Sequence, residues 1–183
     1  MRTWIISLLL LAAGTLHAQE AATNNDQMHD LLIERGLITR ITDMGQKLEA
    51  KATELVLNSM AFLGVPYRRG GNNADTGFDC SGFVRAIYEQ TAGLLLPRQA
   101  AEQAKATAKI EKTELKPGDL VFFNTMRRAF SHVGIYIGNG KFIHSPRTGA
   151  EVRVEDMDAS YWRQRFDGAR RVLTPDNKDS SSR

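Results

Sequence analysis

Cys80 is the only cysteine in the chain, and its surroundings suit nucleophilic chemistry. It lies in the segment GFDCSGFV, where Asp79 is predicted to cap a helix that begins at Cys80. Because a helix N-terminus favours negative charge, we expect a lowered pKa for the thiol, and N–H groups that can hold an oxyanion. Gly82 would leave space for a substrate. The alternative is a small buried packing residue, the common fate of an unpaired cysteine.

Two histidines, His132 and His144, lie in SHVGIYIGNGKFIHS, which is predicted to form a β-hairpin. If residues 138–140 form a three-residue loop, both histidines share one face, with Gly134 between them. A two-residue loop would put them on opposite faces, so the apolar pattern favours the longer loop. The opposite face then carries an apolar stripe of Val133, Ile135, Ile137 and Ile143.

These residue types predict a thiol that His132 activates, with His144 orienting that imidazole through a ring-to-ring hydrogen bond. One alternative is a pair of unrelated polar residues on a half-exposed strand. Another is a zinc site made of Cys80 and both histidines, although structural zinc usually has four ligands in closer pairs. We expect neither a metal nor a cofactor.

Residues 1–18 are typical of a secretory signal peptide, with Arg2, an apolar run from Trp4 to Leu16, and Ala18 at the end. The run is shorter than the roughly 20 residues of a membrane-spanning helix. We therefore expect cleavage after Ala18, a periplasmic or secreted protein, and no stable membrane insertion; an uncleaved anchor is the alternative. Losing Arg2 reduces the net charge from +3 to +2, which does not favour a nucleic-acid partner.

The rest of the chain is predicted to place helices before strands. With 183 residues, one domain is expected, over residues 41–173, after a leader and short N-terminal helix at 19–40 and before a disordered tail at 174–183. Helices are predicted over Asp26–Arg35, Thr42–Leu63, Cys80–Thr91, Gln99–Ala108 and within Asp156–Arg165, and a loop over Tyr67–Phe78. Strands are predicted over Leu120–Phe123, Val133–Ile137, Lys141–Ser145, Glu151–Val154 and Ala169–Leu173. This order indicates an α+β domain with an antiparallel sheet.

Six ordered blocks along the chain form a further pattern. They are GVPYRRGG (64–71), FDCSGFVRAIY (78–88), LPR (96–98), LKPGDLVFF (115–123), SHVGIYIGNGKFIHS (131–145) and GARRV (168–172). Together they resemble the NlpC/P60 family of bacterial cell-wall cysteine peptidases. The resemblance implies a papain-like α+β fold, with helices packed on a central antiparallel sheet. It also implies that Cys80 attacks the substrate, His132 is the base and His144 orients the base.

The resemblance assigns substrate or oxyanion contacts to three further residues. Tyr67 would lie beside the nucleophile and help to stabilise the oxyanion, while Asp79 and Ser81 would line the substrate groove. Each has a purely structural alternative: Tyr67 as a packing aromatic, Asp79 as an N-cap and Ser81 as a first-turn residue. Arginines in flanking loops can meet substrate carboxylates. They are Arg68, Arg69, Arg127 and Arg128.

The implied function is a peptidoglycan endopeptidase that hydrolyses an amide bond in or between stem peptides by a Cys-His-His thiol mechanism. The alternatives are a cell-wall amidase or acyltransferase with the same triad, and a non-catalytic wall-binding module. The segment Asp26–Arg40 lies outside the resemblance. Its apolar residues can dock on the domain or on an adaptor protein; they are Leu31, Leu32, Leu37 and Ile38.

Overall fold

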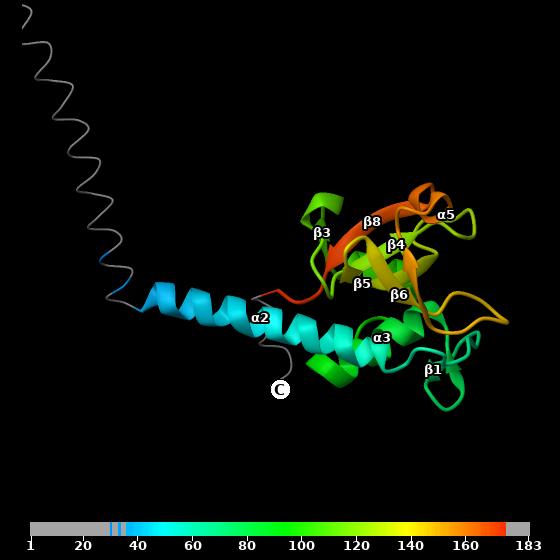
Figure 1. The fold of residues 1–183 in the computed structure, drawn as a ribbon, viewed down its shortest axis with the longest axis horizontal. Coiled ribbons are helices and arrows are strands. Elements are labelled where there is room, and N and C mark those ends of the chain that lie inside the picture. Colours follow the sequence, from blue (N-terminus) through cyan, green and yellow to red (C-terminus); the bar gives the residue numbers. More distant parts are fainter. Residues whose placement is uncertain (1–29, 31–32, 34–35, 175–183) are drawn as a thin grey trace, which may run out of the picture. The chain divides into compact units, whose positions relative to one another are not determined.

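The computed structural model describes residues 30, 33 and 36–174. The chain divides into two compact units, Met1–Gln46 and Lys47–Arg183, and the sheet lies in the second (Figure 1). The predicted signal peptide at 1–18, the leader up to residue 29 and the tail from residue 175 lie outside the described residues, as does most of the predicted helix Asp26–Arg35. Within the described part of the chain, no helix is long and apolar enough to cross a membrane.

Helix α2, Leu37–Met60, differs from the predicted Thr42–Leu63 at both ends. Gly36, with a φ of 63°, precedes the helix, and the chain leaves it through turns that end at Gly64, with a φ of 82°. Both glycines adopt the left-handed conformation that other residues avoid. Conformation at the ends, rather than the apolar period, therefore sets the length of this helix.

The other helices lie close to their predicted positions. Helix α3 spans Cys80–Ala92 and ends at Gly93, whose left-handed backbone donates to Glu89 O at 3.0 Å. Helix α4 spans Ala100–Ala106 and is shorter than predicted, because Ala108 already belongs to a strand. Helix α5 spans Ser160–Arg163, within the range predicted for a short helix.

The segment predicted as a loop, Tyr67–Phe78, contains a small antiparallel ribbon of β1 (Asn72–Asn73) and β2 (Gly77–Phe78). The Asn73 side chain closes its turn by accepting from the Thr76 N–H at 2.9 Å. A side chain that bonds to the backbone two or three residues later stabilises such turns. The ribbon leads directly into Asp79 and helix α3.

Six strands form one antiparallel sheet in the order β3-β8-β4-β5-β6-β7. The five predicted strands are all present: β4 has the predicted bounds, and the other four have shifted ends. Strand β3 and the 3₁₀ helix η1 (Lys112–Glu114) were not predicted. Strand β3 is an edge strand with an exposed first half, so its residues show no apolar alternation. The strands are β3 (Ala108–Ile110), β4 (Leu120–Phe123), β5 (His132–Gly138), β6 (Lys141–His144), β7 (Arg153–Asp156) and β8 (Phe166–Arg171).

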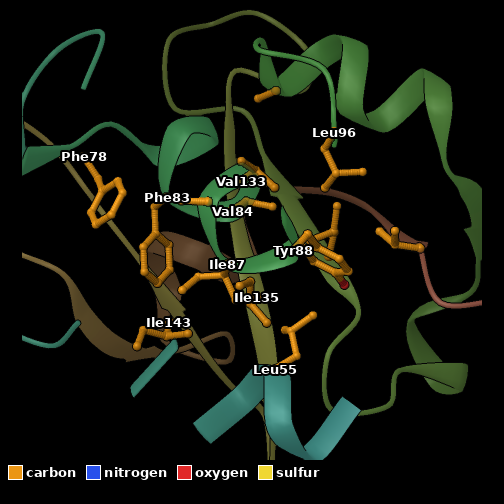
Figure 2. Close-up of a cluster of buried hydrophobic side chains, with 14 of the residues drawn as sticks. Leu55, Phe78, Phe83, Val84, Ile87, Tyr88, Leu96, Val133, Ile135 and Ile143 are labelled. Atoms are coloured by element: carbon orange, nitrogen blue, oxygen red, sulfur yellow. The ribbon is translucent and has the colours of Figure 1, made fainter. Parts of the chain in front are cut away.

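Apolar clusters cover both faces of the sheet, which explains why all four residues of β4 are buried. One cluster joins α3 and Leu55 of α2 to one face, and Figure 2 shows Phe83 of α3 near Ile143 and Ile87 near Ile135. Burying each such side chain contributes about 1.5–3 kcal/mol. The cluster on the other face consists of Val121, Phe123, Phe142, Met157 and Trp162.

The hairpin of β5 and β6 has the predicted facing of side chains but a different turn. Ile135 pairs with Ile143 and Tyr136 with Phe142, as expected for a three-residue loop. The turn itself is tighter, because Gly138 pairs with Lys141 across a register shift. A two-residue turn plus one bulged residue has the same parity as a three-residue loop, so the side chains keep their faces.

Candidate active site

The fold places Cys80 at the first position of α3, against strand β5. Asp79 is the N-cap: its Oδ1 accepts from the Gly82 N–H at 2.8 Å, as predicted. The backbone N–H groups of Val133 and Ser81 interact with the Cys80 sulfur. Since Val133 directly follows His132, the thiol lies at the end of β5 that carries this histidine.

The two histidines form a directly bonded pair. His132 Nε2 and His144 Nδ1 are 2.6 Å apart, and the rings meet edge to face. Both side chains are buried. A Cβ on Gly134 would lie 2.6 Å from Phe142 Cδ2 and 3.2 Å from His144 Cβ, so only glycine leaves room here. Nδ1 is then the remaining His132 nitrogen that a thiol can approach.

Burial lowers the pKa of both histidines. The pKa of His132 falls well below its ordinary value of 6.5, first by loss of hydration and then by the charge of His144. For His144 the same loss of hydration is opposed by Glu155. The pair is therefore neutral at pH 7, the state in which an imidazole can accept a proton.

The expected low pKa of Cys80 is wrong. Burial first, and the adjacent Asp79 carboxylate second, raise the pKa of the thiol to about 11. The N–H groups of Val133 and Ser81 act in the opposite direction and do not compensate. Burial is the larger cause, and the anionic capping residue adds to it by offsetting the positive end of the helix dipole.

Tyr67 and Arg98 lie in the same electrostatic environment as the thiol. Burial raises the pKa of Tyr67, with smaller contributions from Cys80 and Asp79. Arg98 grips Asp79 with two bonds, Nη1 to Oδ1 at 3.0 Å and Nη2 to Oδ2 at 2.5 Å, and donates to Ser81 Oγ at 3.1 Å. The polar groups of Asp79 and Ser81 are thus bonded within the protein.

The structure gives a different reason for Gly82 and places two of the loop arginines. Gly82 is required by the protein itself, since a Cβ there would lie 2.1 Å from Gly71 O. Among the loop arginines, Arg127 lines an open cavity of about 500 Å³. Arg68 is bonded to the β1–β2 ribbon, since its backbone N–H donates to Phe78 O at 2.9 Å. The cavity is lined by Asn124, Thr125, Arg127, Gln164 and Arg165.

Sequence reasoning missed the residues that surround the histidine pair. Glu155 Oε1 lies 3.6 Å from His144 Nε2, and Trp162 stacks on His132 at 5.6 Å between ring centroids. Arg98 was given no role from the sequence, where it was noted only within the LPR block. The described residues contain no group of three or more His, Cys, Asp or Glu that could hold a metal ion.

Comparisons with known proteins give the same class as the fold and the site, a papain-like α+β domain with a thiol at a helix start and histidines on the sheet. The family model described as the NlpC/P60 family matches residues 64–171. The chain belongs to the NlpC/P60 family, and the predicted fold is confirmed.

The matched relatives carry names of hydrolases. The murein DD-endopeptidase MepH of Escherichia coli (strain K12) is 43% identical over 151 residues, 80% of this chain and 56% of that protein. The gamma-DL-glutamyl hydrolase of Bacillus subtilis (strain 168) is 39% identical over 118 residues, 64% of this chain and 28% of that protein. The chain thus spans about half of the first relative's length and less of the second's.

This chain matches almost the whole of one solved domain. The crystal structure of the NlpC/p60 domain of peptidoglycan hydrolase SagA is 33% identical, with a TM-score of 0.58 over 66% of this chain and 98% of that chain. The likeness therefore extends to the arrangement of the helices and the sheet.

Proposed function

We propose that this protein is a cysteine peptidase that hydrolyses amide bonds in the peptide part of peptidoglycan. The observation that carries the proposal is the thiol of Cys80 at the start of α3, beside the strand whose first residue is His132, which is bonded to His144 at 2.6 Å. Family membership and relatives named endopeptidases support the substrate class.

The pKa directions favour proton transfer during attack over a preformed thiolate. His132 Nδ1 removes the proton from the Cys80 sulfur as the sulfur attacks the carbonyl carbon. The resulting oxyanion is held by the backbone N–H of Cys80 at the start of α3, with the Tyr67 hydroxyl as a further donor. The protonated His132 then gives its proton to the leaving amine, and water hydrolyses the thioester with His132 again as base.

The DD bond between two stem peptides is the first candidate for the cleaved bond, because MepH is named a murein DD-endopeptidase. A γ-DL-glutamyl bond is the second, because the Bacillus subtilis relative is named a gamma-DL-glutamyl hydrolase. Both substrates carry carboxylates. The cavity that contains Arg127 and Arg165 suits such groups, since guanidinium groups bind carboxylates with paired hydrogen bonds.

The direct experiment incubates the protein with purified sacculi, digests the product with a muramidase, and identifies new peptide termini by mass spectrometry. Wild type should release fragments with termini at one of the two bonds. Cys80→Ala should release none, while its circular dichroism and melting temperature match wild type. Equal release by both proteins would refute the mechanism.

The same experiment separates the alternatives. An amidase would release whole stem peptides from the glycan, an acyltransferase would yield exchanged peptides, and a wall-binding module would bind sacculi without any new terminus. Action in the periplasm or outside the cell follows from the proposed substrate and the predicted signal peptide. Docking of an adaptor on the N-terminal segment also remains our proposal; Leu37 and Ile38 there are exposed.

A further inference from the structure

We propose that Glu155 is a positioning residue that sets the proton arrangement of the His132–His144 pair. The inference rests on the proposed function only for its effect on rate; its effect on the histidines can be measured without any substrate. Glu155 lies on β7, beside the strand that carries His144.

Glu155 faces the outer nitrogen of the pair. In the β6–β7 register, Phe142 is opposite Glu155 and His144 is opposite Arg153, so all four side chains share one face of the sheet. Glu155 Oε1 is 3.6 Å from His144 Nε2. Within the described residues, that nitrogen is buried and has no hydrogen bond, so the carboxylate is the charged group placed to balance it.

The carboxylate is itself held in place. Trp162 Nε1 donates to Glu155 Oε2, and Arg153 Nε donates to Oε1 at 2.5 Å. Trp162 also stacks on His132 and meets the ring of His144 edge to face at 5.1 Å. One indole therefore fixes the carboxylate and both imidazoles together.

An ionised carboxylate has no proton to donate, and at 3.6 Å its charge favours a hydrogen over a lone pair on His144 Nε2, which decides the tautomers. Its pKa is lowered to about 2, first by the contact with His144, so it is charged at neutral pH. The hydrogen of His144 then lies on Nε2, and Nδ1 has a lone pair that accepts from His132 Nε2. His132 keeps its own lone pair on Nδ1, where a base for Cys80 needs it.

The same charge stabilises the imidazolium that forms when His132 takes the thiol proton. Four groups act on the pair from the surrounding elements: the Cys80 thiol on α3, Arg153 and Glu155 on β7, and the Trp162 indole on α5. Of these, Glu155 favours the protonated pair and Arg153 disfavours it. The two residues should therefore have opposite effects on the basicity of the histidines.

The test compares kcat/KM against pH for a cross-linked muropeptide, using Glu155→Gln, Arg153→Gln and wild type. Glu155→Gln keeps an acceptor for Trp162 and removes the charge. We expect the plateau to fall about tenfold and the acidic limb, which reports protonation of the pair, to move down by about one pH unit. Arg153→Gln should move the acidic limb upward. Glu151→Gln, an exposed glutamate in the same segment, should behave as wild type.

A plateau within twofold of wild type and an unmoved limb for Glu155→Gln would overturn the inference, as would limb shifts of the same sign for Glu155→Gln and Arg153→Gln. ¹⁵N NMR of the wild-type histidines gives a measurement independent of folding defects and of activity. We expect His144 to carry its hydrogen on Nε2, and a hydrogen on Nδ1 would also overturn the inference. If wild type cleaves nothing, the proposed function fails while the tautomer still tests Glu155.

Discussion

The thiol of Cys80 should titrate far above an ordinary cysteine, and this is the sharpest test of the site's chemistry. Its pKa is raised from 9.0 to about 11, a difference of two units. Between pH 7 and 8, the thiolate fraction of Cys80 should then be about one hundredth of that of a reference thiol. Because only the thiolate is alkylated, the labelling rate should fall by the same factor of about one hundred.

The measurement is direct because the chain contains one cysteine. The rate of modification by iodoacetamide is followed by intact mass spectrometry from pH 6 to 11, with protein unfolded in urea as the reference. The unfolded thiol should titrate near 9.0, and the folded thiol should show no midpoint below pH 10.

Asp79→Asn provides the matched variant, since Asn caps a helix as well as Asp does. It removes the second cause of the raised pKa while burial, the first cause, stays. Arg98, about one third exposed, loses its carboxylate partner but remains hydrated. The midpoint should move down by about one pH unit, and labelling near neutral pH should become faster.

A folded midpoint at or below 9.0 would refute this reasoning. It would mean that a thiolate–imidazolium pair exists before substrate binds, so that His132 is already protonated and does not act as the base during attack. An unchanged midpoint in Asp79→Asn would show that burial alone raises the pKa.

Three further outcomes are expected. Gly134→Ala should lower the free energy of unfolding in urea by about 2 kcal/mol, since its Cβ would lie 2.6 Å from Phe142 Cδ2; an unchanged value would contradict this close packing. Arg171→Ala should cost about 3 kcal/mol in the same assay, because the buried Asp119 loses both of its bonds to Arg171; a loss under 0.5 kcal/mol would contradict it. The pKa of Glu155 is lowered from 4.5 to about 2, so the charged carboxylate stabilises the fold above pH 4.5, and this stabilisation is lost as the pH falls through 2. The melting temperatures of wild type and Glu155→Gln should therefore converge between pH 4.5 and 2, and a constant difference would contradict the lowered pKa.

Local chemistry was enough to predict most of the fold. The bounds of β4 follow from four apolar residues after a Pro-Gly-Asp turn, and those of α3 from a capping aspartate and a terminal glycine. Strand β3 escaped prediction because an exposed edge strand needs no apolar alternation. The predicted three-residue turn of the histidine hairpin was wrong. Which side chains share a face depends only on whether the register shift is odd or even, and the bulge preserves the predicted facing.

Some residues of the site could be predicted from local sequence, and others depend on tertiary packing. The pairing of His132 with His144 follows from the hairpin register, which is a local property. Glu155 comes from another strand and Trp162 from a short helix, and both reach the histidines only through the packing of the second face of the sheet. In sequence, Glu155 precedes Asp156 and lies two residues after Arg153, a charged pattern typical of a solvated strand. The error in the pKa of Cys80 has a related cause: burial, the larger contribution to the raised pKa, depends on tertiary packing, and the charge of the capping Asp79 adds to it.

A raised thiol pKa also suits a single cysteine in an oxidising compartment. Thiols react with disulfides and oxidants as thiolates, so a pKa of about 11 keeps Cys80 slow to react while no substrate is bound. His132, neutral and bonded to His144, can take the proton at the moment of attack without requiring a permanent charge on sulfur. Under this scheme the anionic cap protects the nucleophile, and Glu155 at the far end of the histidine pair supplies the field that makes the proton transfer favourable. Reactivity then depends on the presence of a bound carbonyl group, which would suit an unpaired thiol if the predicted export takes place.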